Sequence, residues 1–372
     1  MIFETPPFWM WIVGFLLVLG PLVTMHELGH YVVGRIFGVR ADSFSVGFGR
    51  ELAGFTDRRG TRWKLSALPL GGYVQFAGDM NPASQPSPEW LALPPEEREQ
   101  TFQAKPLWQR TLIVLAGPVT NFLIAIMILA AFNFAYGKEF TAPLVEQVVA
   151  GSAADQAGIE AGDRIVALDG TAIESFEQVA RYVSLYPGQR VVVAYERDGG
   201  VHRVPVTLGS LTQRDRFGNE YRFGRLGIGA YERRTVPVGP IESVALAVSQ
   251  TGEIVRTMIT GIWQIVTGMR PVDELGGPLK IAKFSAEQLS LGPLSFVSFV
   301  ALISINLAFI NLLPIPALDG GHLAFYAAEA VRRRPASLRS QEWAFRTGIA
   351  FVLALMLFVT INDIVSLPIF GG

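Results

Sequence analysis

Long apolar runs, separated by polar stretches, dominate the chain. Four of them are long enough for a helix to cross a hydrocarbon core, which takes roughly 20 residues. They cover residues 8–37, 108–136, 295–330 and 345–369. The pattern therefore predicts a multi-span α-helical membrane protein with about four transmembrane helices.

The first apolar run differs from a cleaved signal peptide. No lysine or arginine precedes it, and it is longer than the roughly 7 to 15 apolar residues of a signal-peptide core. We expect this run to be retained as the first transmembrane helix.

A fifth stretch, residues 243–269, has apolar residues at helical spacing but also polar and charged ones. A fifth crossing would place the basic loop after the third apolar run on the wrong side of the membrane. We therefore expect either a helix that lies at the outer interface or an amphipathic helix packed on the protein. The polar residues are Gln250, Glu253, Arg256 and Gln264.

Lysine and arginine are concentrated in two loops between the predicted helices. Because the chain is expected to cross the membrane four times, both loops lie on the same side of the membrane. Because cytoplasmic loops carry an excess of these residues, we expect both loops in the cytoplasm and the long segment 138–294 outside it. The residues are Arg40, Arg50, Arg58, Arg59, Arg62 and Lys64 in the first loop, and Arg332, Arg333, Arg334, Arg339 and Arg346 in the second.

The composition supports a membrane protein. Half of the residues are hydrophobic, 17% are charged, and the mean hydropathy is +0.35. The net charge of -1 provides no overall field to attract nucleic acid. The absence of cysteine excludes disulfides, cysteine catalysis and thiolate metal sites.

The first apolar run contains a pattern typical of zinc hydrolases. His26 and His30 are four residues apart, so on a helix both imidazoles lie on one face and can bind one zinc ion. Glu27, at the next position, is suited to act as a general base beside the metal. Ionisable groups inside a membrane helix are costly and usually functional, which argues against two merely structural histidines.

A hydrolytic zinc ion usually has a third protein ligand, and Asp319 is the best candidate among the other apolar runs. Pro314 and Pro316 break the helix just before it, and irregular backbone at membrane depth is tolerated only inside protein or around a wet cavity. His322 is the alternative ligand, or a group that supports the ligands.

With these motifs the chain resembles the site-2 protease family of intramembrane zinc metalloproteases, specifically the bacterial branch that includes the regulator of sigma-E protease. Residues 26–30 are similar to the family's HExGH helix, residues 311–320 to its NxxPxPxLDG motif, and residues 117–121 to its GPxxN element. The resemblance covers nearly the whole chain.

The resemblance implies roles for individual residues. His26, His30 and Asp319 correspond to the zinc ligands and Glu27 to the base, while Asn311 corresponds to a polar group that contacts the substrate or transition state.

Two residues of the second apolar run have less definite roles. Asn121 is a candidate for the active site, although an asparagine in a membrane helix often only bonds to a neighbouring helix. We expect Gly117 to allow close packing.

Residues 63–78 combine extended-favouring residues with a Pro-Leu-Gly-Gly turn and resemble the family's membrane-reentrant β-element. Its free edge could pair with an unwound substrate segment, which gives Gly71, Gly72 and Tyr73 a substrate-binding role. The alternative is a surface hairpin. We attach no function to the Pro-rich run 81–95.

Residues 145–230 read as a compact β-rich domain whose segment 151–170 resembles bacterial PDZ domains, with a groove helix near 176–186. Such grooves bind an extended peptide, often a C-terminus. The domain could exclude large substrates or bind a newly exposed C-terminus, and the sequence does not choose between these. Residues 233–294 are too few for a second PDZ domain.

These observations predict four regions. Residues 1–137 hold two transmembrane helices and the β-element, 138–232 the PDZ domain, 233–294 an amphipathic helical linker, and 295–372 the last two helices.

The predicted function is cleavage of single-span membrane proteins in regulated intramembrane proteolysis, in the lipid bilayer of a bacterial cytoplasmic membrane. The resemblance implies anti-sigma-factor-like substrates and remnant signal peptides. The alternative is a non-catalytic membrane scaffold that binds partners through its PDZ domain, but the intact Glu27 argues against it. A transporter fits less well, because no inverted repeat is evident.

Overall fold

The computed structural model describes residues 6–78, 93–214, 220–230, 233–269, 272, 276–334 and 337–365. The chain divides into two compact units. The first comprises Met1–Leu129, Val248–Val255 and Leu275–Asp363, and the second comprises Ala130–Ala247, Arg256–Glu274 and Ile364–Gly372. Residues 81–92 of the Pro-rich run lie outside the described residues.

Four helices of the described part are long and apolar enough to cross a membrane, which confirms the predicted number of spans. The elements are α1 (Phe8–Ile36), α4 (Leu107–Tyr136), α9 (Pro293–Leu312) and α11 (Leu338–Val365). The helix α7 (Pro240–Val266) is of similar length but is not one of the four.

The third predicted span, residues 295–330, is wrong in its extent. Helix α9 ends at Leu312, and α10 (Asp319–Arg332) begins after an irregular turn. Pro314 and Pro316 cause this interruption, since proline lacks an N–H and disfavours helical backbone at the residue before it. Within the turn, Ala317 has a φ of 93°, a conformation uncommon for a residue with a Cβ atom.

Helix α8 (Pro278–Ser290) packs against α1 where Gly14 leaves room for the backbone of Ser285. The N-terminus of α8 is capped from the end of α11. The buried Asp363 carboxylate accepts hydrogen bonds from the backbone N–H groups of Gly277 and Lys280, which are among the helix N–H groups that lack partners within the helix.

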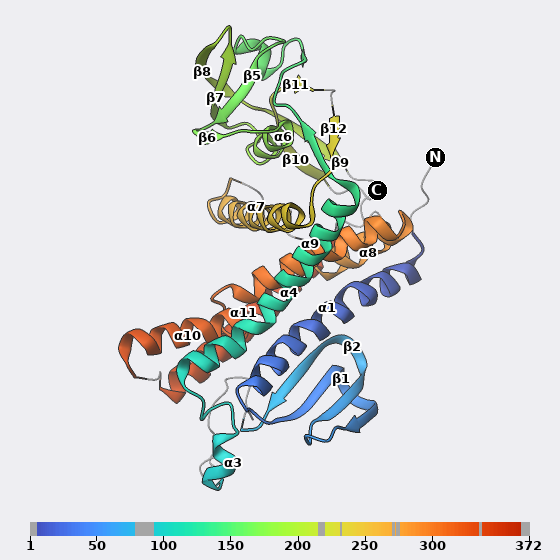
Figure 1. Cartoon of the computed structure of the whole chain (residues 1–372), viewed down its shortest axis with the longest axis vertical. Helices are drawn as coiled ribbons and strands as arrows, with labels where there is room; N and C mark the ends of the chain where they lie inside the picture. Colours follow the sequence, from blue (N-terminus) through green and yellow to red (C-terminus); the bar gives the residue numbers. More distant parts are fainter. Residues whose placement is uncertain are drawn as a thin grey trace. The chain divides into compact units, whose positions relative to one another are not determined.

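The predicted β-element is present beside α1 as two long, bent antiparallel strands, β1 (Ala41–Thr56) and β2 (Arg62–Phe76) (Figure 1). The start of β1 pairs on both sides, since Ser45 lies opposite both Lys64 and Tyr73. Residues 72–76 therefore form an outer strand of this small sheet, and that strand faces α1.

The second unit contains the β-rich insertion, a four-stranded antiparallel sheet in the order β6-β5-β7-β8 with two short helices. It is the PDZ-like domain that the sequence predicts. Its helices are α5 (Ala153–Gln156) and α6 (Phe176–Ser184), and its strands are β4 (Gln147–Val148), β5 (Arg164–Leu168), β6 (Thr171–Ala172), β7 (Arg190–Arg197), β8 (Gly200–Thr207), β9 (Gly209–Arg214), β10 (Glu220–Arg225) and β11 (Ile228–Gly229).

Two further strands frame this domain. Strand β3 (Lys138–Thr141) pairs with β12 (Arg233–Val236) and also contacts α6. The core of the domain consists of aliphatic side chains that include Val145, Ile165, Leu168, Val179, Val193 and Leu208.

A short helix of the first unit, α3 (Pro95–Glu99), lies in the loop before α4.

A buried ion pair ties the ends of β5 and β7 in this domain. Asp163 is fully buried, and Arg197 donates to its two carboxylate oxygens from Nε at 2.7 Å and Nη2 at 2.8 Å. Burial opposes ionisation of Asp163, but the hydrogen bonds from Arg197 and from the backbone N–H of Glu160, together with the charge of Arg197, outweigh it and lower the pKa of this carboxyl. The pair therefore stabilises the domain above the ordinary Asp pKa of about 3.9, and this contribution is lost as the pH falls through the lowered folded-state pKa.

Replacing Arg197 with Met is expected to lower the free energy of unfolding of this domain by about 2 to 3 kcal/mol at neutral pH, because it leaves the Asp163 carboxylate buried without its partner. The matched control is Arg203→Met, at an exposed position on β8. Hydrogen exchange on the full-length protein measures both. The difference between wild type and Arg197→Met should shrink as the pH falls below the ordinary Asp pKa of about 3.9, and a difference independent of pH would contradict the assignment.

Candidate metal centre

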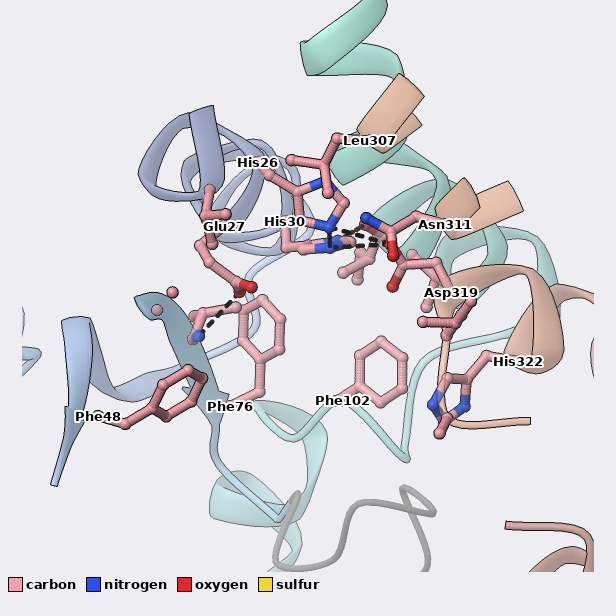
Figure 2. Close-up of a pocket in the computed structure, with 18 of the residues that line it drawn as sticks. His26, Glu27, His30, Phe48, Phe76, Phe102, Leu307, Asn311, Asp319 and His322 are labelled. Carbon is pink, nitrogen blue, oxygen red and sulfur yellow. Dashed lines mark hydrogen bonds and ion pairs between the residues drawn. The ribbon is translucent and has the colours of Figure 1, made fainter. Parts of the chain in front are cut away.

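Three side chains from α1 and the start of α10 converge on one point (Figure 2). The Nε2 atoms of His26 and His30 are 3.2 Å apart, and they lie 3.1 Å and 3.5 Å from Oδ2 of Asp319. Both histidines are buried. The structure thus brings together the three residues that the sequence singles out as metal ligands, from distant parts of the chain.

Local structure explains how the cluster forms. The spacing of four residues puts both imidazoles on one face of α1. Asp319 is the first residue of α10, and Gly320 and Gly321 follow it. A Cβ atom on either glycine would collide with the backbone carbonyls of the preceding turn, so these glycines let the helix start fold tightly against that turn.

The protonation pattern of the cluster fits a metal ion. Nδ1 of His30 lies 2.8 Å from the carbonyl oxygen of Ile113, which only accepts hydrogen bonds, so Nδ1 carries a proton. In the neutral imidazole, Nε2 then has a lone pair for a metal ion. Oδ2 of Asp319 is buried and has no hydrogen-bond partner among the described residues. Two imidazole nitrogens and a carboxylate oxygen form a typical set of protein ligands for a hydrolytic zinc ion, and the site therefore fits zinc.

Asn121 supports His26 from behind rather than lining the cavity. Its side-chain nitrogen is 3.3 Å from Nδ1 of His26, while its Oδ1 is buried without a partner in the described part of the chain. If Nε2 of His26 binds a metal, Nδ1 carries the proton and requires an acceptor. Rotation of the Asn121 amide supplies that acceptor. The backbone carbonyl of Asn121 accepts a hydrogen bond from the Ser304 hydroxyl on α9.

We expect Asn121→Leu to weaken zinc binding about 10- to 100-fold, the effect typical of losing a group that orients a ligating histidine. Asn121→Asp keeps an acceptor of the same shape and should retain most of the affinity. Competition with a zinc chelator on the purified protein measures both variants. A leucine variant that holds zinc as tightly as wild type would show that Asn121 does not orient His26.

Glu27 lies on the adjoining face of α1, where its Oε2 accepts a hydrogen bond of 3.1 Å from the backbone N–H of Val74 on β2. Figure 2 shows the carboxylate between α1 and this strand, on the same side as the two imidazoles. The predicted base is therefore next to the cluster and linked to the β-element.

A cavity of about 750 Å³ opens onto the cluster. Gly71, Gly72 and Asn311, for which the sequence predicts a substrate-binding role, line it, and so does His322. Tyr73 is not a lining residue, and its ring stacks on Phe48 with centroids 6.1 Å apart.

Asn311 and His322 occupy different places around Asp319. The Asn311 side chain lies beside Asp319 and the imidazoles, whereas His322 lies on the far side of Asp319 (Figure 2). His322 is not a member of the three-residue cluster.

Two groups that contact the site residues are not predicted from the sequence. The Ile113 carbonyl and the Val74 N–H are backbone groups, and the residue type at these positions does not indicate their roles. Gly117 was expected to permit close packing, and this is confirmed, because a Cβ atom there would collide with both imidazoles. Its position in the GPxxN element was the available signal that it lies at the site itself.

The chain is similar in sequence to known metalloproteases. A model of peptidase family M50 matches residues 14–355. The chain is 45% identical over 362 residues to a provisionally named zinc metalloprotease of Agrobacterium fabrum, with 96% of each chain covered. It is 35% identical over 388 residues to the metalloprotease MmpA of Caulobacter vibrioides, again with 96% of each covered. Among solved structures it is similar to the PDZ domain of an SdrC-like protein from Listeria monocytogenes, at 22% identity and a TM-score of 0.20, over 24% of this chain and 88% of that one.

Proposed function

Because the chain belongs to peptidase family M50, we propose that it is an intramembrane zinc metalloendopeptidase that cuts transmembrane segments of other proteins. The observation that carries this proposal is the cluster of His26, His30 and Asp319. The cluster lies beside Glu27 at a cavity between helices that are apolar enough to span a membrane. A purely structural metal site would need neither the neighbouring base nor the cavity.

Each residue of the site would have a distinct role in hydrolysis. His26, His30 and Asp319 would hold the zinc ion, which supplies Lewis acidity toward water and toward a carbonyl oxygen. The Glu27 carboxylate accepts the proton of the attacking water and passes it to the nitrogen of the leaving amine. Asn311, in the cavity wall beside Asp319, is placed to donate from its amide to an oxygen of the substrate.

The substrate has to lose its helical structure before it is cut, because a helix hides its peptide groups in its own hydrogen bonds. The outer strand of the β-element, with Gly71 and Gly72 at the cavity, supports strand addition as the way in which the unwound segment is held. Tyr73 would act through the position of this strand, since its side chain packs on Phe48.

The natural substrates that we propose are single-span membrane proteins in regulated intramembrane proteolysis, in the manner of the sigma-E branch. Anti-sigma-factor-like proteins and remnant signal peptides are the two classes. The basic loops support an orientation in a bacterial cytoplasmic membrane with the site toward the cytoplasm and the PDZ-like domain outside. That domain would receive a peptide or a C-terminus from the substrate, or would exclude substrates with large outer portions.

The test is reconstitution of the purified full-length protein in lipid vesicles with a model single-span substrate. We expect cleavage inside the transmembrane segment, located by mass spectrometry of the fragments, and we expect a chelator to abolish it and added zinc to restore it. A substrate whose segment carries a helix-destabilising Gly pair should be cut faster than one with a continuous Leu helix. Cleavage only outside the membrane segment, or cleavage insensitive to chelation, would overturn the proposal.

A further inference from the structure

The hydrogen bond between Glu27 and β2 links the base to the strand beside the cavity. Residues 72–75 pair in regular antiparallel register with residues 46–43 of β1. In such a ladder, the N–H and C=O of one residue point to the partner strand and those of the next point away. The N–H of Val74 points away, because it donates to Oε2 of Glu27 at 3.1 Å. Gly72, two residues earlier, therefore also directs its backbone groups away from β1.

Helix α1 covers part of this outward edge. The ring of Phe76 occupies the space beside Gly34, where a Cβ atom would collide with it, and Glu27 occupies the N–H of Val74. Gly72 lines the cavity, and a Cβ atom there would lie 3.6 Å from Cγ of Glu27. From Val74 onward, α1 therefore covers the edge of the strand that points away from β1, whereas at Gly72 this edge faces the cavity.

We propose that the backbone N–H of Val74 positions the catalytic base. A glutamate side chain has several rotatable bonds, and fixing one of its oxygens limits the positions of the other. The bond to Val74 engages Oε2 in a charge-assisted hydrogen bond, and a carboxylate has further lone pairs for the proton of water. The outer strand of β2, which faces the substrate, therefore also orients the Glu27 carboxylate.

A second consequence rests on the proposed function. One N–H cannot serve two acceptors at full strength, so a substrate strand is excluded from Val74 and pairs at Gly72 and toward the preceding residues. The backbone groups of Tyr73 point toward β1. The edge offered to the substrate is therefore short, and it lies directly beside the base.

Hydrogen exchange on the metal-free, full-length protein tests the contact without any need for cleavage. In Glu27→Ala, we expect the Val74 amide to exchange at least about tenfold faster, since a hydrogen bond to a charged group is lost. In Glu27→Gln the side-chain carbonyl still accepts, so protection should largely persist. The amides of Tyr73 and Gln75, which pair with β1, are the internal controls. Equal exchange of Val74 in wild type and Glu27→Ala would overturn the proposal.

Kinetics of two variants then separate positioning from substrate binding. Val74→Pro removes the N–H at an outward edge position, where proline is tolerated, and Val74→Ala keeps it. Because Val74 lines the cavity, the two variants are compared with each other. We expect the kcat of Val74→Pro to lie about 10- to 100-fold below that of Val74→Ala, with similar KM values and with zinc retained in both, as for a misplaced catalytic group. Equal kcat values for the two variants would overturn the positioning role. A raised KM alone would assign the N–H to the substrate. A wild type without cleavage would instead refute the proposed function and leave the exchange result valid.

Discussion

Replacing Glu27 with Gln is expected to abolish cleavage while the protein keeps its zinc. Glutamine has nearly the same shape and can still accept the hydrogen bond from Val74, but its amide does not take a proton from water at neutral pH. Loss of a general base typically costs about 10²- to 10⁴-fold in rate. For slow cleavage of a membrane substrate, such a loss brings the activity below detection.

The measurement is cleavage of the single-span substrate by wild type and Glu27→Gln in parallel, with bound zinc determined in both. The three-residue cluster is untouched by this change, so the metal content should be equal. Equal cleavage by the two proteins would mean that Glu27 is not the base or that a contaminating protease is at work. Loss of zinc in the variant would mean that Glu27 contributes to holding the metal.

The central part of the site could be predicted because it obeys local rules. The four-residue spacing of His26 and His30 places them on one helix face whatever the rest of the fold does. Asp319 could be proposed as the third group because it follows two prolines in an apolar run, where only a protein-lined cavity tolerates irregular backbone. The number of spans followed from length and apolarity alone.

The supporting contacts could not be predicted, because they depend on how distant elements meet. The carbonyl of Ile113 and the N–H of Val74 are common to every residue type, so only the packing of α4 and β2 against α1 gives them a role. Asn121 was recognised as polar and intramembrane, but its placement behind His26 depends on the rotation of α4. The two prolines predict the break in the third apolar run, but the predicted span is too long because hydropathy continues through the turn that they create.

The close packing of α4 against α1 at Gly117 is the basis of the other large expected effect, a loss of zinc binding. Gly117 on α4 faces the imidazoles, and a Cβ atom built there would collide with Nε2 of His30 and lie 2.8 Å from Cε1 of His26. A Cβ atom built on Gly29 of α1 would likewise lie 2.5 Å from the backbone oxygen of Ala116. The two helices are therefore in close contact here, and α4 cannot move away without losing that contact. A single methyl group therefore has to displace the histidines themselves.

We expect Gly117→Ala to lower zinc affinity by at least about 100-fold and to abolish cleavage, because metal ligands have to be held within about 0.5 Å of their productive positions. The control is Gly261→Ala, a helical glycine of α7 with nothing within 4 Å of the added Cβ atom, where alanine should be neutral or slightly stabilising. Chelator competition and substrate cleavage measure both variants, and a thermal melt monitors folding. If Gly117→Ala binds zinc like wild type, α4 does not approach the histidines closely enough to shape the site. A folded variant without zinc would show that the centre depends on the close approach of two membrane helices as much as on its ligands.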